Sequence, residues 1–410
     1  MRDATGYSLR ITDSLLGAQM LFVAFGALVL VPILTGLDPN VALFTAGLGT
    51  IAFQIITRGK VPVFLASSFA FIAPISYGVK TWGIPGTLCG LAAAGVLYVI
   101  LSFIIRIKGS GILERYLPPV VTGPVIMVIG LVLAPVAVGM ANGSIGDGRI
   151  VGADAMIIST VALATTVIVS IFGGGFLRLI PIFCGIGAGY VIALIMGLID
   201  FSPITNAAWF AVPDFTAPTW NFDAILYIVP VAIAPAIEHV GDVLAIGSIT
   251  KKDYVKDPGV ENTMLGDGIA TSIAAFFGGP PNTTYSEVSG AVALTKAFNP
   301  AIMTWAAVCA ILLAFVGKIG AFLATIPSPV MGGVMVLLFG MITVIGMNTL
   351  VRAGKDLATP RSLVIIAVIL VAGIGGMKFT AGTFSIEKIG LAAILGIVLN
   401  LILPQERKEE

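Results

Sequence analysis

Four carboxylates lie in segments of the chain that are otherwise almost entirely apolar: Glu238, Asp242, Asp267 and Glu287. A carboxylate at the centre of a membrane helix costs about 2.5 to 3.5 kcal/mol, so such residues usually bind a ligand, relay protons or line a pathway. We therefore expect Glu238 and Glu287 to be functional. For Asp242 and Asp267 a structural role, accepting hydrogen bonds or capping a helix, stays equally open.

The residues around Glu238 are spaced to form one helix face. Glu238 and Asp242 are four positions apart and share this face, and Gly241 leaves room beside it for a ligand or a close helix. His239, the only histidine, points about 100° away round the helix. A packing role for His239 is favoured, although histidine chemistry also permits proton transfer, so Glu238, Asp242 and His239 are the candidates for proton coupling.

The sequence lacks the patterns of an enzyme, a metalloprotein or an ATP-driven pump. A single histidine and no cluster of ligands at metal spacing argue against a metal site, and we expect no cofactor. No serine has a histidine and an acid arranged to activate it, and no phosphate-binding glycine loop is present. We expect a protein that is not an enzyme.

The composition indicates a polytopic membrane protein. Hydrophobic residues make up 58% of the chain and charged residues 10%, against about 25% charged in soluble domains. The 49 glycines suit closely packed membrane helices. Residues 17–34 are too long an apolar run for a cleaved signal and are predicted to be the first span. The three cysteines, Cys89, Cys184 and Cys309, fall in apolar runs and suit packing, and a net charge of +1 without a basic block gives no sign of nucleic-acid binding.

Two hydrophobic segments are too short and too broken to cross a bilayer as plain helices. After Pro280 and Pro281, residues 285–295 allow about three helical turns, roughly 16 Å against a hydrocarbon core of about 30 Å. Residues 60–77 have the same order of proline, extended run, hydroxyl pair, aromatic residue and short helix. We expect a short strand and then a half-helix in each, with Glu287 in the first turn of the second. Such backbone at membrane depth predicts a cavity between the two.

Hydropathy predicts fourteen spans in an all-α membrane fold, and the two interrupted segments are spans three and ten. With the N-terminus inside, most basic residues face the cytoplasm, which supports an even span count and two cytoplasmic termini. The basic residues left outside are Lys80, Arg149, Lys318, Lys378 and Lys388. The predicted spans begin near Ser14, Asn40, Val61, Gly83, Pro118, Val151, Phe176, Phe222, Asn262, Pro280, Ala301, Pro329, Ser362 and Lys388.

An internal repeat relates the two halves of the chain. Residues 119–123, Pro-Val-Val-Thr-Gly, followed by Gly130, recur as residues 329–333, Pro-Val-Met-Gly-Gly, followed by Gly340. The two interrupted segments repeat in nearly the same register. Seven spans separate the members of each pair, so the second copy is upside down and the predicted architecture is seven plus seven, inverted. The alternative is chance recurrence of Pro and Gly in a glycine-rich membrane protein.

The predicted cavity suits a small planar molecule. Half-helix N-termini offer N–H donors to carbonyl oxygens, and the two glutamates accept from ligand N–H groups. Phe69, Tyr285 and Phe339 offer flat apolar faces. A pyrimidine or purine base, with alternating N–H and C=O groups, fits this combination. A simple anion would be repelled by the glutamates unless they were protonated.

The chain resembles the nucleobase-ascorbate transporters, also called the nucleobase:cation symporter-2 family, and within them the bacterial uracil permeases. The resemblance covers nearly the whole chain. It is carried by residues 25–27 (Phe-Gly-Ala), 62–74, 238–241 (Glu-His-Val-Gly), 281–287 (Pro-Asn-Thr-Thr-Tyr-Ser-Glu) with Gly290 and Thr295, and 329–333.

The resemblance implies a core domain of residues 1–112 and 222–325 and a gate domain of residues 113–221 and 326–410. It also implies a homodimer through the gate domains and proton-coupled uptake across the inner membrane. Glu238 and Glu287 would bind the base, backbone at Phe69, Tyr285 and Ser286 would help, and Phe69 and Tyr285 would flank the ring. Phe339 and, from the first motif, Ala27 complete the implied site.

Three departures from the uracil permeases bear on the substrate. Residues 286–288 read Ser-Glu-Val instead of Gly-Glu-Asn, Asp242 replaces a histidine, and Phe339 replaces a tyrosine. An aspartate at position 242 resembles the xanthine and urate branch of the family, whereas a glutamate at position 287 favours uracil as the substrate. We expect a proton-coupled uracil importer, with a xanthine or urate permease as the alternative. Less favoured are an anion transporter of the same fold, against which the short tail after Ile402 speaks, and a receptor that binds a base without moving it.

Overall fold

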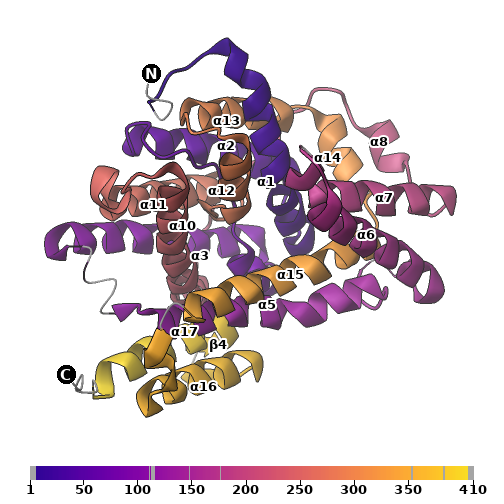
Figure 1. Ribbon diagram of the computed structural model, residues 1–410. Helices are drawn as coiled ribbons and strands as arrows, with labels where there is room; N and C mark the ends of the chain where they lie inside the picture. The colour runs from indigo at the N-terminus through magenta and orange to yellow at the C-terminus, as the bar shows by residue number, and fades with distance from the viewer. Residues whose placement is uncertain are drawn as a thin grey trace.

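The computed structural model describes residues 6–109, 111, 116–146, 148–175, 177–351, 354–381 and 384–404. Within these residues the fold is mostly helical, with four short strands (Figure 1). The α-helices are α1 (Ser14–Thr35), α2 (Pro39–Ile56), α3 (Ile72–Lys108), α5 (Pro119–Ala141), α6 (Gly152–Phe172), α7 (Pro181–Ile195), α8 (Ser202–Asn206), α9 (Phe222–Ile228), α10 (Ile233–Thr250), α11 (Val260–Phe277), α12 (Ser286–Thr295), α13 (Ala301–Ala314), α14 (Gly317–Ala324), α15 (Ser328–Val351), α16 (Pro360–Ile374) and α17 (Lys388–Ile402). The strands are β1 (Leu65–Ser67), β2 (Asn282–Thr284), β3 (Lys378–Ala381) and β4 (Phe384–Glu387). Shorter helical turns are η1 (Ile11–Asp13), η2 (Phe69–Phe71), η3 (Leu177–Leu179), η4 (Val229–Ala232), η5 (Val255–Gly259) and η6 (Gly354–Ala358).

The helices confirm a multi-pass membrane protein. Among the described residues, seven helices are long and apolar enough to cross a membrane, and four shorter apolar helices of 10–17 residues accompany them. Several helices begin at or next to predicted span starts, for example at Ser14, Phe222 and Ala301. The count of fourteen spans and the inverted repeat stay predictions.

Helix α3 contains the predicted boundary between spans three and four. At Gly83 the backbone has φ 71° and ψ 175°, which is not helical, so two helices meet there at a kink. Glycine adopts this left-handed φ without the clash that a Cβ would cause. Pro85 follows within the same helix and cannot donate a backbone hydrogen bond, which favours the break at this point.

The most extensive helix pairing joins α5 and α15, which run side by side in Figure 1. These are the helices that carry the repeated Pro and Gly pattern. A Cβ at Gly123 would lie 2.8 Å from the Gly346 carbonyl oxygen, and one at Gly346 would lie 2.7 Å from the Gly123 carbonyl oxygen. Only residues without a side chain let the two backbones approach this closely, which is how small residues drive helix association in lipid.

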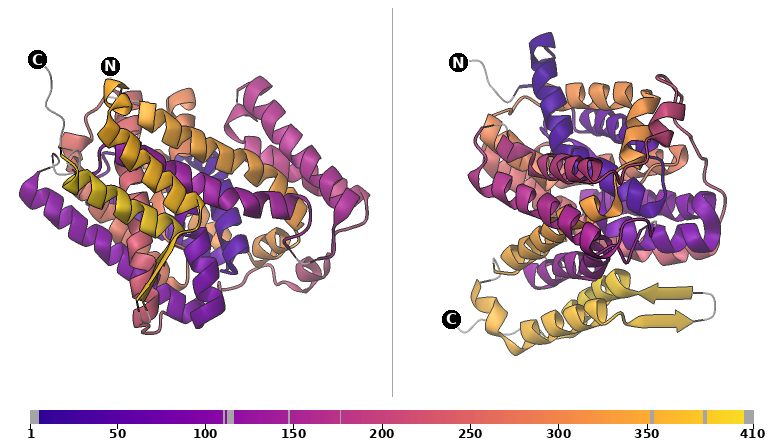
Figure 2. Two further views of the ribbon diagram at one scale, coloured as in Figure 1. Left: turned by 90° about the horizontal axis from the view of Figure 1, so that it is seen from below. Right: turned by 90° about the vertical axis from the view of Figure 1, so that its right-hand side faces the viewer.

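A second group of helices packs around α2. Helix α11 contacts α2 and α3, and α13 contacts α1 and α2. Helices α16 and α17 pack on each other and on α5, and the antiparallel β3–β4 hairpin extends beside them at one end of the molecule (Figure 2). The sequence did not predict this hairpin.

Some predictions fall on residues outside the described part of the chain. They are the span start near Phe176, the domain boundary between residues 112 and 113, and the cytoplasmic placement of Arg2, Arg115, Arg352, Arg407 and Lys408.

Candidate functional site

The two interrupted segments meet in the interior as a pair of short antiparallel strands. β1 pairs with β2 in the register Leu65 to Thr284 and Ser67 to Asn282. The Ser68 amide extends the pairing by donating to the Pro281 carbonyl at 2.9 Å. Each strand leads into a helix, β1 through η2 into α3 and β2 into α12. The predicted order of extended backbone followed by helix is therefore present in both segments.

Buried polar side chains from the neighbouring helices complete the hydrogen bonding of the strands. The Leu65 amide donates to the Thr50 hydroxyl at 2.9 Å, and Thr271 donates to the Asn282 carbonyl at 2.8 Å. The Asn282 side-chain amide in turn donates to the Thr45 carbonyl at 2.9 Å. Such partners are required because a strand pair this short leaves backbone groups that lipid cannot satisfy.

Three aromatic rings gather where the two segments turn into helices. The Phe69 ring centroid lies 6.2 Å from that of Tyr285 and 6.3 Å from that of Phe339, edge-on to the latter at 83°. Both distances are typical of interacting aromatic pairs. All three side chains are buried. Phe69 and Tyr285 belong to the two interrupted segments and Phe339 to α15, so the cluster joins elements from distant parts of the chain.

The Tyr285 hydroxyl is buried and has no hydrogen-bond partner among the described residues. The backbone of Ala27 on α1 lies near this hydroxyl but outside hydrogen-bonding geometry. A buried hydroxyl without a partner is costly, so a ligand or a water molecule that reached it would be stabilised. The structure thus places the backbone of Ala27 beside the aromatic cluster.

Glu287 and Glu238 lie on two different helices. Glu287 is in the first turn of α12, whose N-cap is Tyr285, and Glu238 is in α10; both are partly buried. Glu238 lies within electrostatic range of Asp242, Glu287 and Asp267. One turn beyond each glutamate is a glycine, Gly241 or Gly290, with no atom within 4 Å of its Cβ position. Open space therefore adjoins both glycines, which are exposed.

Glu287 also lines a cavity of about 340 Å³ between α12 and the helices α6, α7 and α15. The cavity is otherwise mostly apolar, with Ile182 and Leu338 among its lining residues and the hydroxyls of Thr166 and Ser170 at one side. Its volume falls in the range of small-molecule sites. A carboxylate facing an apolar cavity can orient a polar ligand by accepting its N–H groups.

His239 and Asp267 form a fully buried pair. His239 Nδ1 lies 2.8 Å from Asp267 Oδ2, and both side chains are 1% exposed. His239 Nε2 lies 2.9 Å from the Thr263 hydroxyl, which donates to the Val260 carbonyl at 3.1 Å. The tautomer of His239 decides which of the two atoms donates in the contact between Nε2 and the Thr263 hydroxyl. Both ring nitrogens of His239 therefore have partners within the protein.

Asp267 and Asp242 are both tied to β2. Asp267 Oδ2 accepts from the Thr283 hydroxyl at 3.2 Å and from the Thr284 amide at 3.3 Å. The Thr284 hydroxyl donates to Asp242 Oδ2 at 2.9 Å. The sequence allowed a pairing role for Asp267 but did not identify Thr263, Thr283 or Thr284 as partners.

The structure brings most of the predicted site residues together. Glu287, Tyr285, Phe69, Phe339 and Ala27 lie near the junction of the strands with their helices. Asp242 on α10 accepts from Thr284 of β2, and Glu238 lies one turn away on the same helix. Ser286 is the first residue of α12. Its backbone is at the expected place, while its side chain is outside the described part of the chain.

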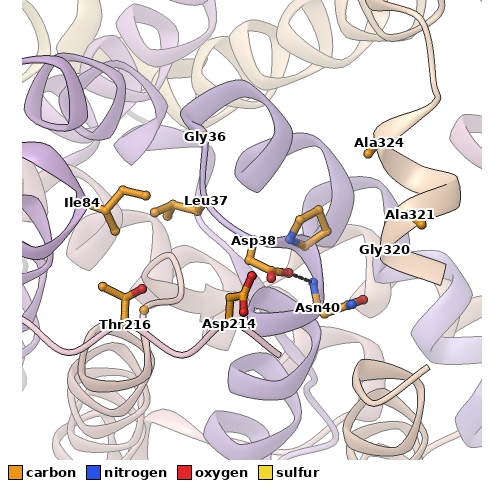
Figure 3. Close-up of a pocket in the computed structure, with 12 residues that line it drawn as sticks. Gly36, Leu37, Asp38, Asn40, Ile84, Asp214, Thr216, Gly320, Ala321 and Ala324 are labelled. Carbon is orange, nitrogen blue, oxygen red and sulfur yellow. Dashed lines mark hydrogen bonds between the residues drawn. The ribbon is translucent and has the colours of Figure 1, made fainter. Parts of the chain in front are cut away.

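A larger cavity, of about 480 Å³, lies elsewhere (Figure 3). It is lined by the turn between α1 and α2, by Ile84, by the chain around Asp214 and by α14. The Asp38 carboxylate in this cavity caps α2 by accepting from the Asn40 amide at 2.6 Å. Its lining residues include neither an aromatic ring nor one of the predicted site residues, so this cavity is not the predicted site.

Comparison with known proteins gives a consistent result. The model of the permease family, Xan_ur_permease, matches residues 12–382. The chain is 55% identical over 400 residues to the probable uracil permease of Haemophilus influenzae, covering 98% of this chain and 96% of that protein. It is 46% identical over 400 residues to the uracil permease of Bacillus caldolyticus, covering 95% and 91%. It is 41% identical over 387 residues to the uracil permease of Escherichia coli K12, covering 94% and 90%.

Solved structures with similar folds are far more distant in sequence. The murine anion transporter Slc26a9, in its inward-facing state, superposes with a TM-score of 0.69 at 12% identity, covering 97% of this chain and 69% of that one. The transmembrane domain of the cyanobacterial bicarbonate transporter BicA superposes with a TM-score of 0.65 at 13% identity, covering 97% and 100%. At these identities the likeness concerns the fold alone, which is that of a membrane transporter.

Proposed function

Since the chain belongs to the permease family, we propose that it imports a nucleobase, first of all uracil, by proton-coupled symport. Relatives that it matches over nearly their whole length are named uracil permeases, which are transporters rather than enzymes. Those names do not favour the xanthine or urate alternative. The likeness to anion transporters rests on low identity and carries no argument about the substrate.

The observation that carries the proposal is the meeting of Glu287, the N-terminus of α12 and the three aromatic rings beside the antiparallel pair of β1 and β2. Uracil is flat and edged with two N–H and two C=O groups. In the proposed pose Glu238 and Glu287 accept from its N–H groups, and the backbone amides at the start of α12 donate to a carbonyl oxygen. Phe69 and Tyr285 flank the ring, and Phe339 closes the cluster.

The proposed cycle couples this site to a proton. Glu238 or Asp242 is protonated from outside, the base bridges Glu238 and Glu287, and the site is then exposed to the cytoplasm. Loss of the proton inside restores repulsion among the carboxylates and weakens the binding of the base. We assign the proton to these two residues rather than to His239, which is 1% exposed and pairs with the Asp267 carboxylate.

The proposed moving parts are the core domain, residues 1–112 and 222–325, and the gate domain, residues 113–221 and 326–410. The packing of α11 with α2 and α3, and of α5 with α15, supports this division. The contacts between β1 and β2, and between α5 and α15, join segments matched by the internal repeat and support seven plus seven inverted spans. We further propose a homodimer through the gate domains, in the inner membrane, with both termini in the cytoplasm.

The test is uptake of radiolabelled uracil into proteoliposomes with and without an inward proton gradient, competed by unlabelled xanthine, urate and thymine. Accumulation of uracil that depends on the gradient supports the proposal. Uptake driven by Na⁺ at constant pH would reject the proton coupling, and uptake of xanthine or urate without uracil would reject the substrate. Binding without counterflow would indicate a receptor.

A further inference from the structure

Thr284 joins two parts of the candidate site that the sequence treats separately. It is the last residue of β2 and directly precedes Tyr285, the N-cap of the half-helix α12. Its hydroxyl donates to Asp242 Oδ2 on α10 at 2.9 Å, and all the atoms involved are buried. A single side chain thus connects a carboxylate on one helix to the start of another.

The surroundings fix the direction of the Thr284 hydrogen bond. The Thr284 oxygen lies 3.4 Å from His239 Nδ1, and this nitrogen also lies 2.8 Å from the Asp267 carboxylate. His239 Nδ1–H therefore points at two oxygens, and the Thr284 oxygen can accept from it while the hydroxyl proton goes to Asp242. The Thr284 amide is held independently by Asp267 Oδ2 at 3.3 Å.

We propose that Thr284 is a positioning residue that links the charge of Asp242 to the N-terminus of α12, and so to the residues that hold the substrate. A hydroxyl donates a stronger hydrogen bond to a carboxylate than to a neutral acid, by roughly twofold in energy. Ionised Asp242 therefore holds Thr284 against α10, and protonated Asp242 holds it less. The inference rests on the proposed function for its substrate readout.

Other ionisable groups around Asp242 also affect any pH profile. Helices α5 and α10, strand β2 and the turn η4 all pack in this region, and α5, β2 and η4 contain no ionisable residue. Ionisable residues do occur on α10 and on the other elements packed against it. They are Glu238 and His239 on α10, Glu261 and Asp267 on α11, Glu287 on α12, Lys388 on α17, and Lys256 and Asp257 in η5, and Tyr98 of α3 and Tyr285 lie nearby. A variant that removes only the Thr284 hydroxyl leaves all of them in place.

The test compares Thr284→Val with Thr284→Ser, which keeps the hydroxyl, and with Thr271→Val as matched control. Thr271 is also a buried threonine bonded to β2, but through the Asn282 carbonyl. Equilibrium binding of radiolabelled uracil to the purified protein is measured from pH 5.5 to 8.5. In the wild type one coupled proton weakens binding by up to about tenfold per pH unit above the midpoint.

We expect Thr284→Val to retain tight binding to higher pH, with the midpoint moved up by about one unit, because the ionised form of Asp242 loses the hydrogen bond from the Thr284 hydroxyl. Thr284→Ser and Thr271→Val are expected to keep the wild-type midpoint. In an Asp242→Asn background Thr284→Val should add no further change, since the two residues act as one unit. Should the valine variant not fold, Thr284→Ala removes the same hydroxyl.

A second measurement is independent of uracil. Infrared titration of the lipid-reconstituted protein detects the carboxylic acid band that Asp242→Asn removes, and we expect this band to persist to higher pH in Thr284→Val. An unchanged midpoint in both measurements, an equal shift in Thr271→Val, or pH-independent uracil binding by the wild type overturns the inference. If the wild type binds no uracil, the proposed function fails, and the infrared titration alone decides whether Thr284 controls Asp242.

Discussion

Gly130 on α5 lies against the carbonyl oxygen of Phe339 on α15, closer than any side-chain carbon could. Replacing Gly130 by Ala should force α5 and α15 apart and move Phe339 away from Phe69. Overpacking of this kind costs about 1 to 3 kcal/mol. We expect a lower melting temperature and weaker uracil binding, measured by thermal unfolding with and without uracil.

Gly340, the repeat partner of Gly130, supplies the control for this prediction. No neighbouring atom lies within 4 Å of its Cβ position, so Gly340→Ala should leave the free energy of unfolding within about 0.5 kcal/mol of wild type. Equal losses in the two variants would contradict the packing described for α5 and α15.

Glu287→Gln tests the carboxylate in the first turn of α12. The amide keeps the size of the side chain but places a donor where the ligand N–H needs an acceptor. Loss of a hydrogen bond to a charged group weakens binding by roughly 10- to 150-fold. Isothermal titration with uracil measures this loss, and Glu261→Gln, at the start of α11, is the control. Wild-type affinity in Glu287→Gln would remove Glu287 from the site.

Tyr285→Phe tests the unpartnered hydroxyl. Since this buried hydroxyl has no partner among the described residues, its removal should leave the stability of the ligand-free protein unchanged or raise it by up to about 1 to 3 kcal/mol. If uracil or a water molecule bonded to it occupies this position, the thermal shift on adding uracil should shrink. Tyr98→Phe removes another buried, unpartnered hydroxyl and should leave the uracil-induced shift as it is.

The proposed orientation can be tested with single cysteines at exposed positions. The native Cys89, Cys184 and Cys309 are free and half-buried, so they are first replaced by serine. A membrane-impermeant maleimide should label Asp214→Cys in intact cells but should label Lys108→Cys only after permeabilisation. Labelling in the reverse order would place the termini outside.

The half-helix could be predicted from the sequence because its signals are local. In residues 280–295, two prolines and a Thr-Thr pair favour extended backbone, and the eleven residues that follow are long enough only for a short helix. The structure has β2 at 282–284 and α12 from Ser286. The break at Gly83 was equally local. Gly and Pro act on their own backbone and on their immediate neighbours, so such features need no knowledge of the rest of the fold.

The partners of the buried carboxylates could not be predicted in the same way. Which hydroxyl reaches Asp242 or Asp267 depends on how α10, α11 and β2 are rotated and shifted against each other, and hydropathy contains no information on that register. The one available signal for these partners was the presence of threonines in otherwise apolar segments, at positions 263, 271, 283 and 284. The β3–β4 hairpin had a signal too, since Phe379 and Ala381, then Phe384 and Ile386, alternate with polar residues.

The pairing of β1 with β2 has a consequence for biosynthesis. When residues 65–67 leave the ribosome, the strand that pairs with them, residues 282–284, has not been translated. The first half of the chain therefore enters the bilayer with an extended segment that lipid cannot solvate, and it must be shielded until the second half is inserted. A chain interrupted between the two halves cannot complete the site, although its apolar helices could still insert.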